Sequence, residues 1–303
     1  MTRIFIDGAA GTTGLEIEMR LSHRAEFELL RLDNAQRKDA VARRDALNAA
    51  DIVILCLPDD AALQAVSLID NPHTRVIDAS TAFRTAVGWT YGFPELGHDV
   101  AGAMRVSNPG CYPTGFLALI TPLIRAGLVP SDWLVTVNAV SGYSGGGKTM
   151  IAEYEGGGEP PAWQGYGLTL AHKHIPEMQR YSGLTNAPVF APSVANAYRG
   201  MIVEVPLHLG ATPGKPSPDA IRESLMAMFE GSAIVTLAEA PANLTIGQAA
   251  GTDRLELFVF GNDDGSQVML VAALDNLGKG ASGAAVQSLN LMVGLPETVG
   301  LKL

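Results

Sequence analysis

The sequence predicts two domains of different class, an α/β domain followed by an α+β domain. Its 303 residues exceed one small module, and 47% hydrophobic residues suffice for packed cores, which excludes wholesale disorder. The first hundred residues alternate short apolar runs with helix-length segments, which is the rhythm of βαβ units on a parallel sheet. After about residue 108 the apolar runs become β-rich with few helices between them, as in an antiparallel or mixed sheet.

The first domain has four expected strands, at residues 3–7, 27–32, 51–57 and 75–79. The third of them (DIVILCL) is continuously apolar, which is typical of a strand buried on both faces. A helix is expected at residues 14–21, and the charged segment through residue 44 is either helix or loop.

The second domain has expected strands at residues 133–140, 200–207, 254–261 and 268–274. A helix is expected at 217–229, because Pro218 lies near its start and apolar residues follow at helical spacing. Residues 283–295 return to a helical pattern, and the glycine- and proline-rich stretch at 156–161 is expected to be a loop.

Charge and cysteine content exclude several classes of protein. Lys and Arg number 21 against 31 Asp and Glu, a net charge of −10, which argues against a nucleic-acid partner. Two cysteines are too few for a disulfide framework and indicate a reducing compartment. The N-terminus lacks a secretory layout, and the uncharged stretch between Arg105 and Arg125 is broken by three prolines and two glycines. We therefore expect a cytoplasmic globular protein with no membrane partner.

A glycine-rich turn follows the first expected strand directly. Gly8, Gly11 and Gly14 form G-x-x-G-x-x-G, where backbone N–H groups at a helix start can approach a pyrophosphate. The alternative is a tight strand-to-helix turn without a ligand.

The residues after the second expected strand bear on whether the cofactor carries a 2′-phosphate. Asp33 could bind a ribose diol and would favour NAD. Arg31, Arg37 and Lys38 could instead bind a 2′-phosphate, and this reading, NADP, is favoured because guanidinium groups suit phosphate. The alternative is a solvated charged segment.

Cys111 is the candidate nucleophile. It lies in SNPGCYPTG just ahead of an expected helix, whose positive end favours the thiolate. Asn108 and nearby backbone N–H groups could hold a developing oxyanion. Cys56 lies in the middle of the third expected strand and is expected to be a packing residue.

His172 and His174 lie close together in AHKHIPEM, and Glu177 follows His174 by three residues. An imidazole could exchange the proton of a carbonyl oxygen, and Glu177 could orient it. Further metal ligands are too few for a metal site, so none is predicted. A surface loop with ordinary histidines is the alternative.

The chain resembles the N-acetyl-gamma-glutamyl-phosphate reductase family in its shorter form, within the semialdehyde dehydrogenase superfamily. The matches lie in order over nearly the whole chain: GAAGTTG, CLPDDAA, DASTAFR, YGFPEL, SNPGCYPT, SGYSGGGK, AHKHIPE, RGM and DNLGKGASGAAVQSLNLMVGLPE. The resemblance implies a doubly wound, Rossmann-type NADP-binding domain at 1–108 plus 276–303, closed by the C-terminal helix. It also implies a catalytic and oligomerisation domain at 109–275.

The residue patterns above and the resemblance together predict roles for single residues. Cys111 is the nucleophile, and His172 or His174 is the acid/base. Substrate-binding residues are Arg84, Asn108, Ser141, Gly142, Lys148, Glu177 and Arg199. Cofactor-binding residues are Gly8, Ala10, Gly11, Thr12, Thr13, Gly14, Arg31, Ser80, Asn276 and Gly280.

The activity implied is NADPH-dependent reduction of N-acetyl-gamma-glutamyl phosphate, a small acyl phosphate, to the 5-semialdehyde with release of phosphate. It proceeds through a cysteine thioester, belongs to arginine biosynthesis and is carried out by a homo-oligomer, a dimer or tetramer. Two alternatives stay open. One is an aspartate-semialdehyde dehydrogenase, whose substrate is one methylene shorter and has a free amine. The other is a non-catalytic dinucleotide sensor. The wording of HKHIPE and SNPGCYPT favours the glutamyl enzyme.

Overall fold

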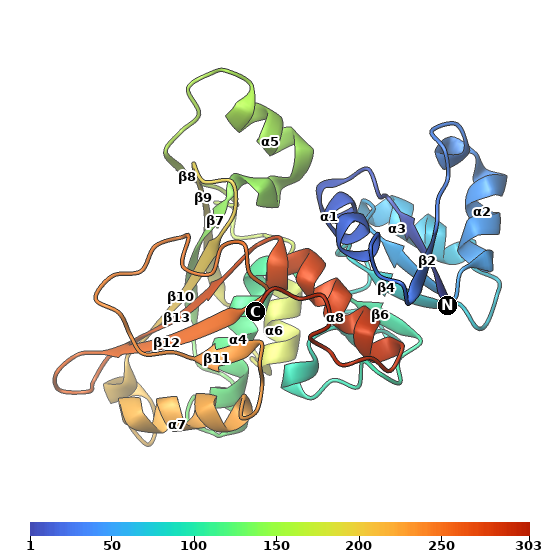
Figure 1. The fold of residues 1–303 in the computed structure, drawn as a ribbon. Coiled ribbons are helices and arrows are strands. Elements are labelled where there is room, and N and C mark those ends of the chain that lie inside the picture. Colours follow the sequence, from blue (N-terminus) through green and yellow to red (C-terminus); the bar gives the residue numbers. More distant parts are fainter. The chain divides into compact units, whose positions relative to one another are not determined.

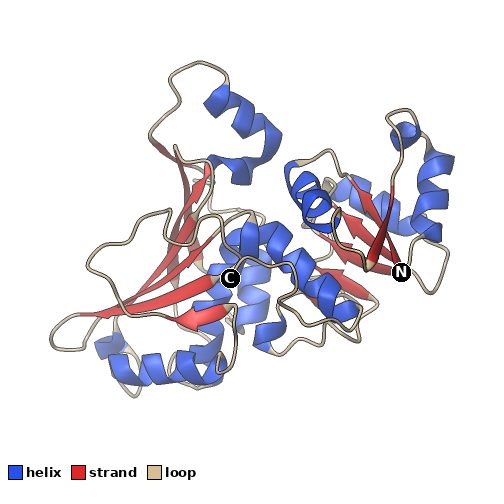
Figure 2. Ribbon diagram, in the orientation of Figure 1, coloured by secondary structure: helices blue, strands red, loops and turns tan.

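The computed structural model describes all residues, 1–303, as two compact units. The first unit contains Met1–Pro109 and Ala281–Leu301, and the second contains Gly110–Gly280 and Lys302–Leu303. The first is an α/β unit on a parallel sheet and the second an α+β unit on a mixed sheet, so the predicted fold class is confirmed (Figures 1 and 2).

The sheet of the first unit has six parallel strands in the order β2-β1-β3-β4-β6-β5. Their bounds are β1 Thr2–Asp7, β2 Phe27–Leu30, β3 Ile52–Leu55, β4 Arg75–Asp78, β5 Thr90–Tyr91 and β6 Arg105–Ser107. From β1 the order runs to β2 on one side and to β3 on the other. This reversal places the end of β1 at the topological switch point, where open α/β sheets bind their ligands.

Helices cover both faces of this sheet. Ile4 and Ile6 in β1 belong to one core with Ile17 and Leu289, whereas Phe5 between them packs in the other core with Leu47. The helices are α1 Thr12–Leu21 and α8 Gly283–Met292 on the first face, and α2 Ala40–Ala49 and α3 Asp59–Ser67 on the second. The last helix of the chain therefore completes the unit that the first strand begins.

The second unit has a seven-stranded mixed sheet in the order β11-β12-β13-β10-β7-β9-β8. The pairs β7–β9 and β11–β12 are parallel, and the other pairs are antiparallel. The bounds are β7 Thr136–Gly142, β8 Trp163–Gly165, β9 Val189–Ala195, β10 Met201–Leu207, β11 Val235–Leu237, β12 Leu255–Gly261 and β13 Val268–Leu274.

A buried helix, α4 Cys111–Arg125, packs on this sheet against β10 and β13. Gly115 permits the close approach, since a Cβ there would lie 2.8 Å from the Val203 side chain. Two helices flank α4, α6 Ile175–Ser182 and α7 Pro218–Met228, and a further helix, α5 Gly147–Glu155, lies between β7 and β8 in the chain (Figure 1). No helix of the structure combines the length and apolar character needed to cross a membrane.

Several elements differ from the sequence predictions. The sequence predicted Cys56 in the middle of a strand, but β3 ends at Leu55 and Cys56 lies just past it. The Cys56 N–H donates to the Asp7 carbonyl, 2.8 Å away. β7 begins at Thr136, since Trp133 closes a turn onto Pro130. The charged segment through residue 44, for which the sequence allowed either helix or loop, forms a 3-10 turn at Gln36–Lys38 and then begins α2.

Candidate active site

The glycine-rich turn joins β1 to α1 in the first unit. Gly8 has φ +89°, and a Cβ at this position would overlap the backbone carbonyl of Cys56. A Cβ at Gly14 would lie 2.5 Å from the Gly8 carbonyl oxygen, and the Gly11 N–H donates to that oxygen over 2.9 Å. Only glycine allows this tight path, which turns the start of α1 toward the carboxyl edge of the sheet.

The other predicted turn residues occupy the same segment. Ala10 lies in the turn, and Thr12 and Thr13 are the first residues of α1, which therefore begins two residues earlier than predicted. Their backbone N–H groups belong to the first turn of the helix, where no intrahelical partner exists. The segment thus has the form of a phosphate-binding helix start.

A cavity of about 300 Å³ opens beside this turn. Its lining includes Gly8 to Ala10, the end of β2 and three arginines: Arg31, Arg37 and Arg43. Arg31 donates to Glu18 over 2.8 Å and Arg43 to Asp7 over 2.8 Å, so a carboxylate already engages each of these two.

Arg37 is the third arginine of this cavity. Its Nε donates to the Leu32 carbonyl over 3.1 Å, and no carboxylate neutralises it. Asp33 does not line the cavity; its Oδ1 accepts from the N–H groups of Ala35 and Gln36 and so closes the local turn. An apolar cavity with one unneutralised guanidinium suits the adenosine end of a phosphorylated dinucleotide.

Three predicted residues from two distant motifs meet at the carboxyl ends of β4 and β6. Arg84 is buried, and its Nε donates to the carbonyl of Asn108 over 3.0 Å. Ser80 donates its hydroxyl to Asp78, 2.6 Å away, and burial raises the pKa of that carboxyl to about 6. Asn108 is 1% exposed and donates to the Ala281 carbonyl, while its Oδ1 has no hydrogen-bond partner. The first unit thus has a hydrogen-bond acceptor, Asn108 Oδ1, and a cation, Arg84, at the carboxyl edge of its sheet. Open α/β sheets bind their ligands at this edge.

Cys111 is the first residue of α4, not a residue ahead of it. The N–H of the preceding residue, Gly110, donates to Glu177 Oε2 over 3.1 Å. The Thr114 hydroxyl donates to the Gly110 carbonyl over 2.9 Å. Glu177 is almost fully buried in the first turn of α6. A role for Glu177 in holding the backbone next to the thiol was not predicted from the sequence.

The two cysteines differ in their surroundings. Burial raises the pKa of the Cys56 thiol to about 12, with the carboxylates of Asp78 and Asp7 adding to the effect. Both cysteines are partly exposed, but only Cys111 lies at a helix N-terminus, where the macrodipole favours an anion. Of the two, Cys111 is the one placed to react.

The paired histidines pack around Tyr112, the residue after Cys111. The rings of His172 and His174 lie 4.7 Å apart, and Tyr112 lies 6.2 and 5.9 Å from them. The backbone N–H of His174 donates to His172 Nδ1 over 3.2 Å, so a neutral His172 carries its proton on Nε2. His174 is the N-cap of α6 and is 6% exposed.

Two tyrosines beside the histidines escaped the sequence analysis. Tyr166 donates to Tyr112, 3.1 Å away, and Tyr112 donates to the Ser193 carbonyl over 3.0 Å. Burial raises the pKa of Tyr166 to about 12 and that of Tyr112 well above its usual value, so both remain protonated donors at neutral pH. The position of Tyr112 next to Cys111 is the one sequence signal that could have singled it out.

The glycine-rich segment after β7, which contains Lys148, is helical. It forms a 3-10 turn, Tyr143–Gly146, and then α5, on whose exposed first turn Lys148 lies. Ser141 and Gly142 end β7 in buried positions, and a Cβ at Gly142 would lie 2.7 Å from the carbonyls of residues 197 and 198. Lys148 forms no hydrogen bond or ion pair with the other predicted residues.

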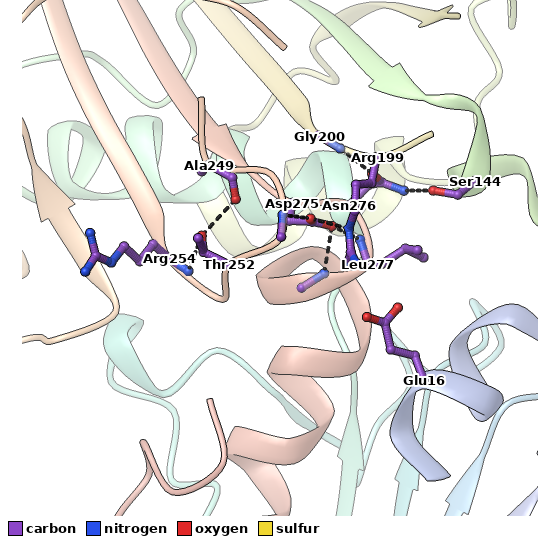
Figure 3. A network of polar contacts seen from close by, with 12 residues as sticks. Glu16, Ser144, Arg199, Gly200, Ala249, Thr252, Arg254, Asp275, Asn276 and Leu277 are labelled. Carbon is purple, nitrogen blue, oxygen red and sulfur yellow. Dashed lines mark hydrogen bonds and ion pairs between the residues drawn. The ribbon is translucent and has the colours of Figure 1, made fainter. Parts of the chain in front are cut away.

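A buried polar network surrounds the end of β13 (Figure 3). Asp275, which is fully buried, accepts from Arg199 Nε over 2.5 Å. Asn276 accepts from the Gly200 N–H over 2.9 Å and donates to Ser144 over 2.8 Å. Asp275 was not among the predicted residues, although it directly precedes Asn276. No group of three or more His, Cys, Asp or Glu side chains is placed to hold a metal ion.

Comparison with known proteins gives the same division of the chain into two parts. Residues 3–103 match the semialdehyde dehydrogenase NAD binding domain, and residues 111–276 match the semialdehyde dehydrogenase dimerisation domain. Among solved structures, aspartate semialdehyde dehydrogenase II from Vibrio cholerae aligns with a TM-score of 0.70 at 17% identity over 97% of this chain and 98% of that one. The enzyme from Candida albicans with NADP aligns with a TM-score of 0.68 at 15% identity, over 97% and 98%. These likenesses show the fold.

Two curated relatives are much closer in sequence. N-acetyl-gamma-glutamyl-phosphate reductase 2 of Nostoc sp. is 48% identical, covering 99% of both chains. N-acetyl-gamma-glutamyl-phosphate reductase of Rhizobium etli is 51% identical, covering 96% of this chain and 98% of the relative. The resemblance inferred from the motifs is confirmed. The chain belongs to the N-acetyl-gamma-glutamyl-phosphate reductase family of semialdehyde dehydrogenases.

Proposed function

We propose that this enzyme reduces N-acetyl-gamma-glutamyl phosphate to N-acetylglutamate 5-semialdehyde with NADPH and releases phosphate, as a step of arginine biosynthesis. The observation that carries the proposal is a partly exposed cysteine that opens a buried helix and is followed by a tyrosine packed on two histidines. The names of relatives 48–51% identical supply the substrate.

In the proposed reaction, the Cys111 thiolate forms a bond to the acyl carbon, and the bond from that carbon to the phosphate oxygen breaks. A thiolate suits this role because it attacks well near neutral pH and its thioester is easily reduced. The bound dinucleotide supplies the hydride. Cys111 then leaves from the resulting thiohemiacetal, which gives the aldehyde and restores the free thiolate.

Proton transfer to and from the substrate oxygen falls to the histidine pair in this proposal. His172 holds its neutral-state proton on Nε2 through the bond from the His174 backbone, which makes it a donor. His174 remains the alternative, since it begins α6 beside the same tyrosine. Arg84, Arg199 and Lys148 are the proposed partners for the anionic groups of the substrate, and Asn108 and Ser141 are further proposed substrate-binding residues.

The test of this function is phosphate-dependent reduction of NADP with N-acetylglutamate 5-semialdehyde, run beside aspartate semialdehyde. We expect turnover with the acetylated aldehyde only, and only when phosphate is present. Preference for the shorter aldehyde would keep the thioester chemistry but assign the aspartate-semialdehyde reaction. Tight dinucleotide binding without turnover of either aldehyde would overturn the proposal.

We propose NADP as the cofactor and Arg37 as the residue that selects it. Arg31 and Arg43 line the same cavity, but each is paired with a carboxylate, whereas Arg37 contacts only a backbone carbonyl. A 2′-phosphate placed there would gain charge-assisted hydrogen bonds from Arg37 without first breaking an ion pair. Arg31, favoured from the sequence, is the less suitable of the two.

Replacing Arg37 with glutamine should therefore weaken NADP binding about 10- to 100-fold, since a hydrogen bond to a charged group contributes roughly 1.5–3 kcal/mol. NAD binding should change by less than about twofold, because NAD lacks the 2′-phosphate. Arg31→Gln is the matched control and should have the smaller effect on NADP. Equal losses of NADP and NAD affinity, measured by fluorescence titration, would show that Arg37 does not read the phosphate.

Homo-oligomerisation through the second unit is also part of the proposal. That unit matches a dimerisation domain, and large apolar side chains are exposed around β7 to β9, at Leu134, Trp163 and Val189. Burying such side chains against a second copy would favour association. Light scattering of the purified protein distinguishes monomer, dimer and tetramer. A cytoplasmic location stays a prediction.

A further inference from the structure

Asp275 has no role in the proposed reaction, yet its side-chain carboxylate accepts four hydrogen bonds. Its Oδ1 accepts from the backbone N–H groups of Leu277, 2.8 Å away, and Gly278, 3.1 Å away. Its Oδ2 accepts from the N–H of Gly251 and from Arg199 Nε. Three of the four donors are backbone groups, so the orientation of the carboxylate is set before Arg199 binds to it (Figure 3).

Arg199 is the one side-chain donor in this set. The Arg199 side chain is 25% exposed, whereas that of Asp275 is fully buried. The arginine side chain therefore extends from the buried carboxylate toward solvent. A hydrogen bond through Nε engages one edge of the planar guanidinium and thereby fixes the plane of the whole group. The next residue is held as well, because the Gly200 N–H donates to Asn276.

The same turn also reaches the nucleophile. The Gly280 N–H donates to the Asp275 backbone carbonyl over 3.0 Å, and a Cβ at Gly280 would lie 2.9 Å from Cys111 Cβ. Within a single compact unit, Asp275 therefore contacts the Arg199 guanidinium through its carboxylate and, through its backbone carbonyl, the glycine that packs on Cys111.

We propose that Asp275 is a positioning residue that holds the Arg199 guanidinium at a fixed place relative to Cys111 for an anionic group of the substrate. This inference rests on the proposed function. A charge alone would attract an anion from many directions, whereas a fixed planar guanidinium favours one bidentate geometry. Asp275 acts through Arg199 and touches no reacting atom itself.

The test is a double-mutant cycle of Asp275→Asn and Arg199→Gln, with the KM for phosphate and for N-acetylglutamate 5-semialdehyde as the readout. We expect Asp275→Asn to raise one of these KM values about tenfold, with kcat changed less than about threefold. The double variant should match Arg199→Gln within about a factor of two, because Asp275 has no separate effect once Arg199 is gone. Multiplying effects in the double variant, or a lowered Tm with both KM values unchanged, would overturn the proposal.

A second variant decides the matter if Asp275→Asn does not fold. Arg199→Lys keeps the positive charge but lacks the Nε–H donor, so it should raise the same KM nearly as much as Arg199→Gln. Wild-type affinity in Arg199→Lys would mean that the charge alone suffices and would overturn the inference.

The exposed pair Asp219–Arg222 in α7 provides the matched control. Asp219→Asn and Arg222→Gln should leave both KM values unchanged. A wild-type protein inactive with both aldehydes would refute the proposed function, whereas an active wild type with unaltered variants would refute only the role of Asp275.

Discussion

Replacing Cys111 with serine is expected to reduce turnover roughly 10³-fold or more, because a serine hydroxyl is a poor nucleophile near neutral pH without a dedicated base. Binding of NADPH should persist, since the glycine-rich turn and the arginine-lined cavity proposed to bind it lie in the other unit. The measurement is phosphate-dependent NADP reduction beside a fluorescence titration with NADPH. Substantial activity in Cys111→Ser would remove the thiol from the mechanism.

The second cysteine supplies the control for that experiment. Cys56→Ala should keep activity within about threefold, since this thiol is a packing group. Its pKa of about 12 predicts alkylation on the order of a thousandfold slower than that of an ordinary thiol at pH 8, because only the thiolate reacts. Iodoacetamide with mass spectrometry should therefore label Cys111 first and remove activity in parallel. Early labelling of Cys56 would contradict this assignment.

Replacing Gly8 with alanine is expected to abolish dinucleotide binding and to lower the Tm by more than about 5 °C. A positive φ costs a non-glycine residue about 1–2 kcal/mol, and forcing a methyl group against the Cys56 carbonyl costs about 1–3 kcal/mol more. Relieving the clash must move the turn between β1 and α1, and with it the backbone N–H groups proposed to bind the pyrophosphate.

Gly88→Ala separates the two causes. Gly88 has φ +82°, but a Cβ there would meet nothing within 4 Å, so only the backbone strain is added. We expect a small loss of stability and unchanged NADPH affinity, measured by thermal unfolding and titration. If Gly8→Ala behaved like Gly88→Ala, close packing at Gly8 would have no part in cofactor binding.

The parallel sheet could be predicted because its information is local. Strand β1 alternates Ile4, Phe5 and Ile6 between two faces, and glycines follow it at once, so both the strand and the turn are evident within a dozen residues. Elements that depend on partners were harder to predict. β9 contains Pro192 and was not predicted, because its pairing with β7 compensates for a residue that strands disfavour.

The candidate site divides in the same way. Reactive residue types in distinctive motifs, such as Cys111 and the histidine pair, could be selected from the sequence. Asp275 could not, because nothing in its own motif shows that Arg199, 76 positions earlier, lies beside it. Likewise, the carboxylate that neutralises Arg31 lies 13 positions away on α1, and only that contact separates Arg31 from Arg37 as a phosphate ligand.

Local patterns in the chain were therefore sufficient for the two fold classes, the glycine-rich turn, the candidate nucleophile and the family. The contacts among distant segments determined which arginine stays unneutralised, which cysteine has a raised pKa and which carboxylate holds the turn beside Cys111. The physical reason is that residue type and short-range spacing are properties of the sequence itself. Burial, ion pairing and the resulting pKa values depend on neighbours that folding brings together.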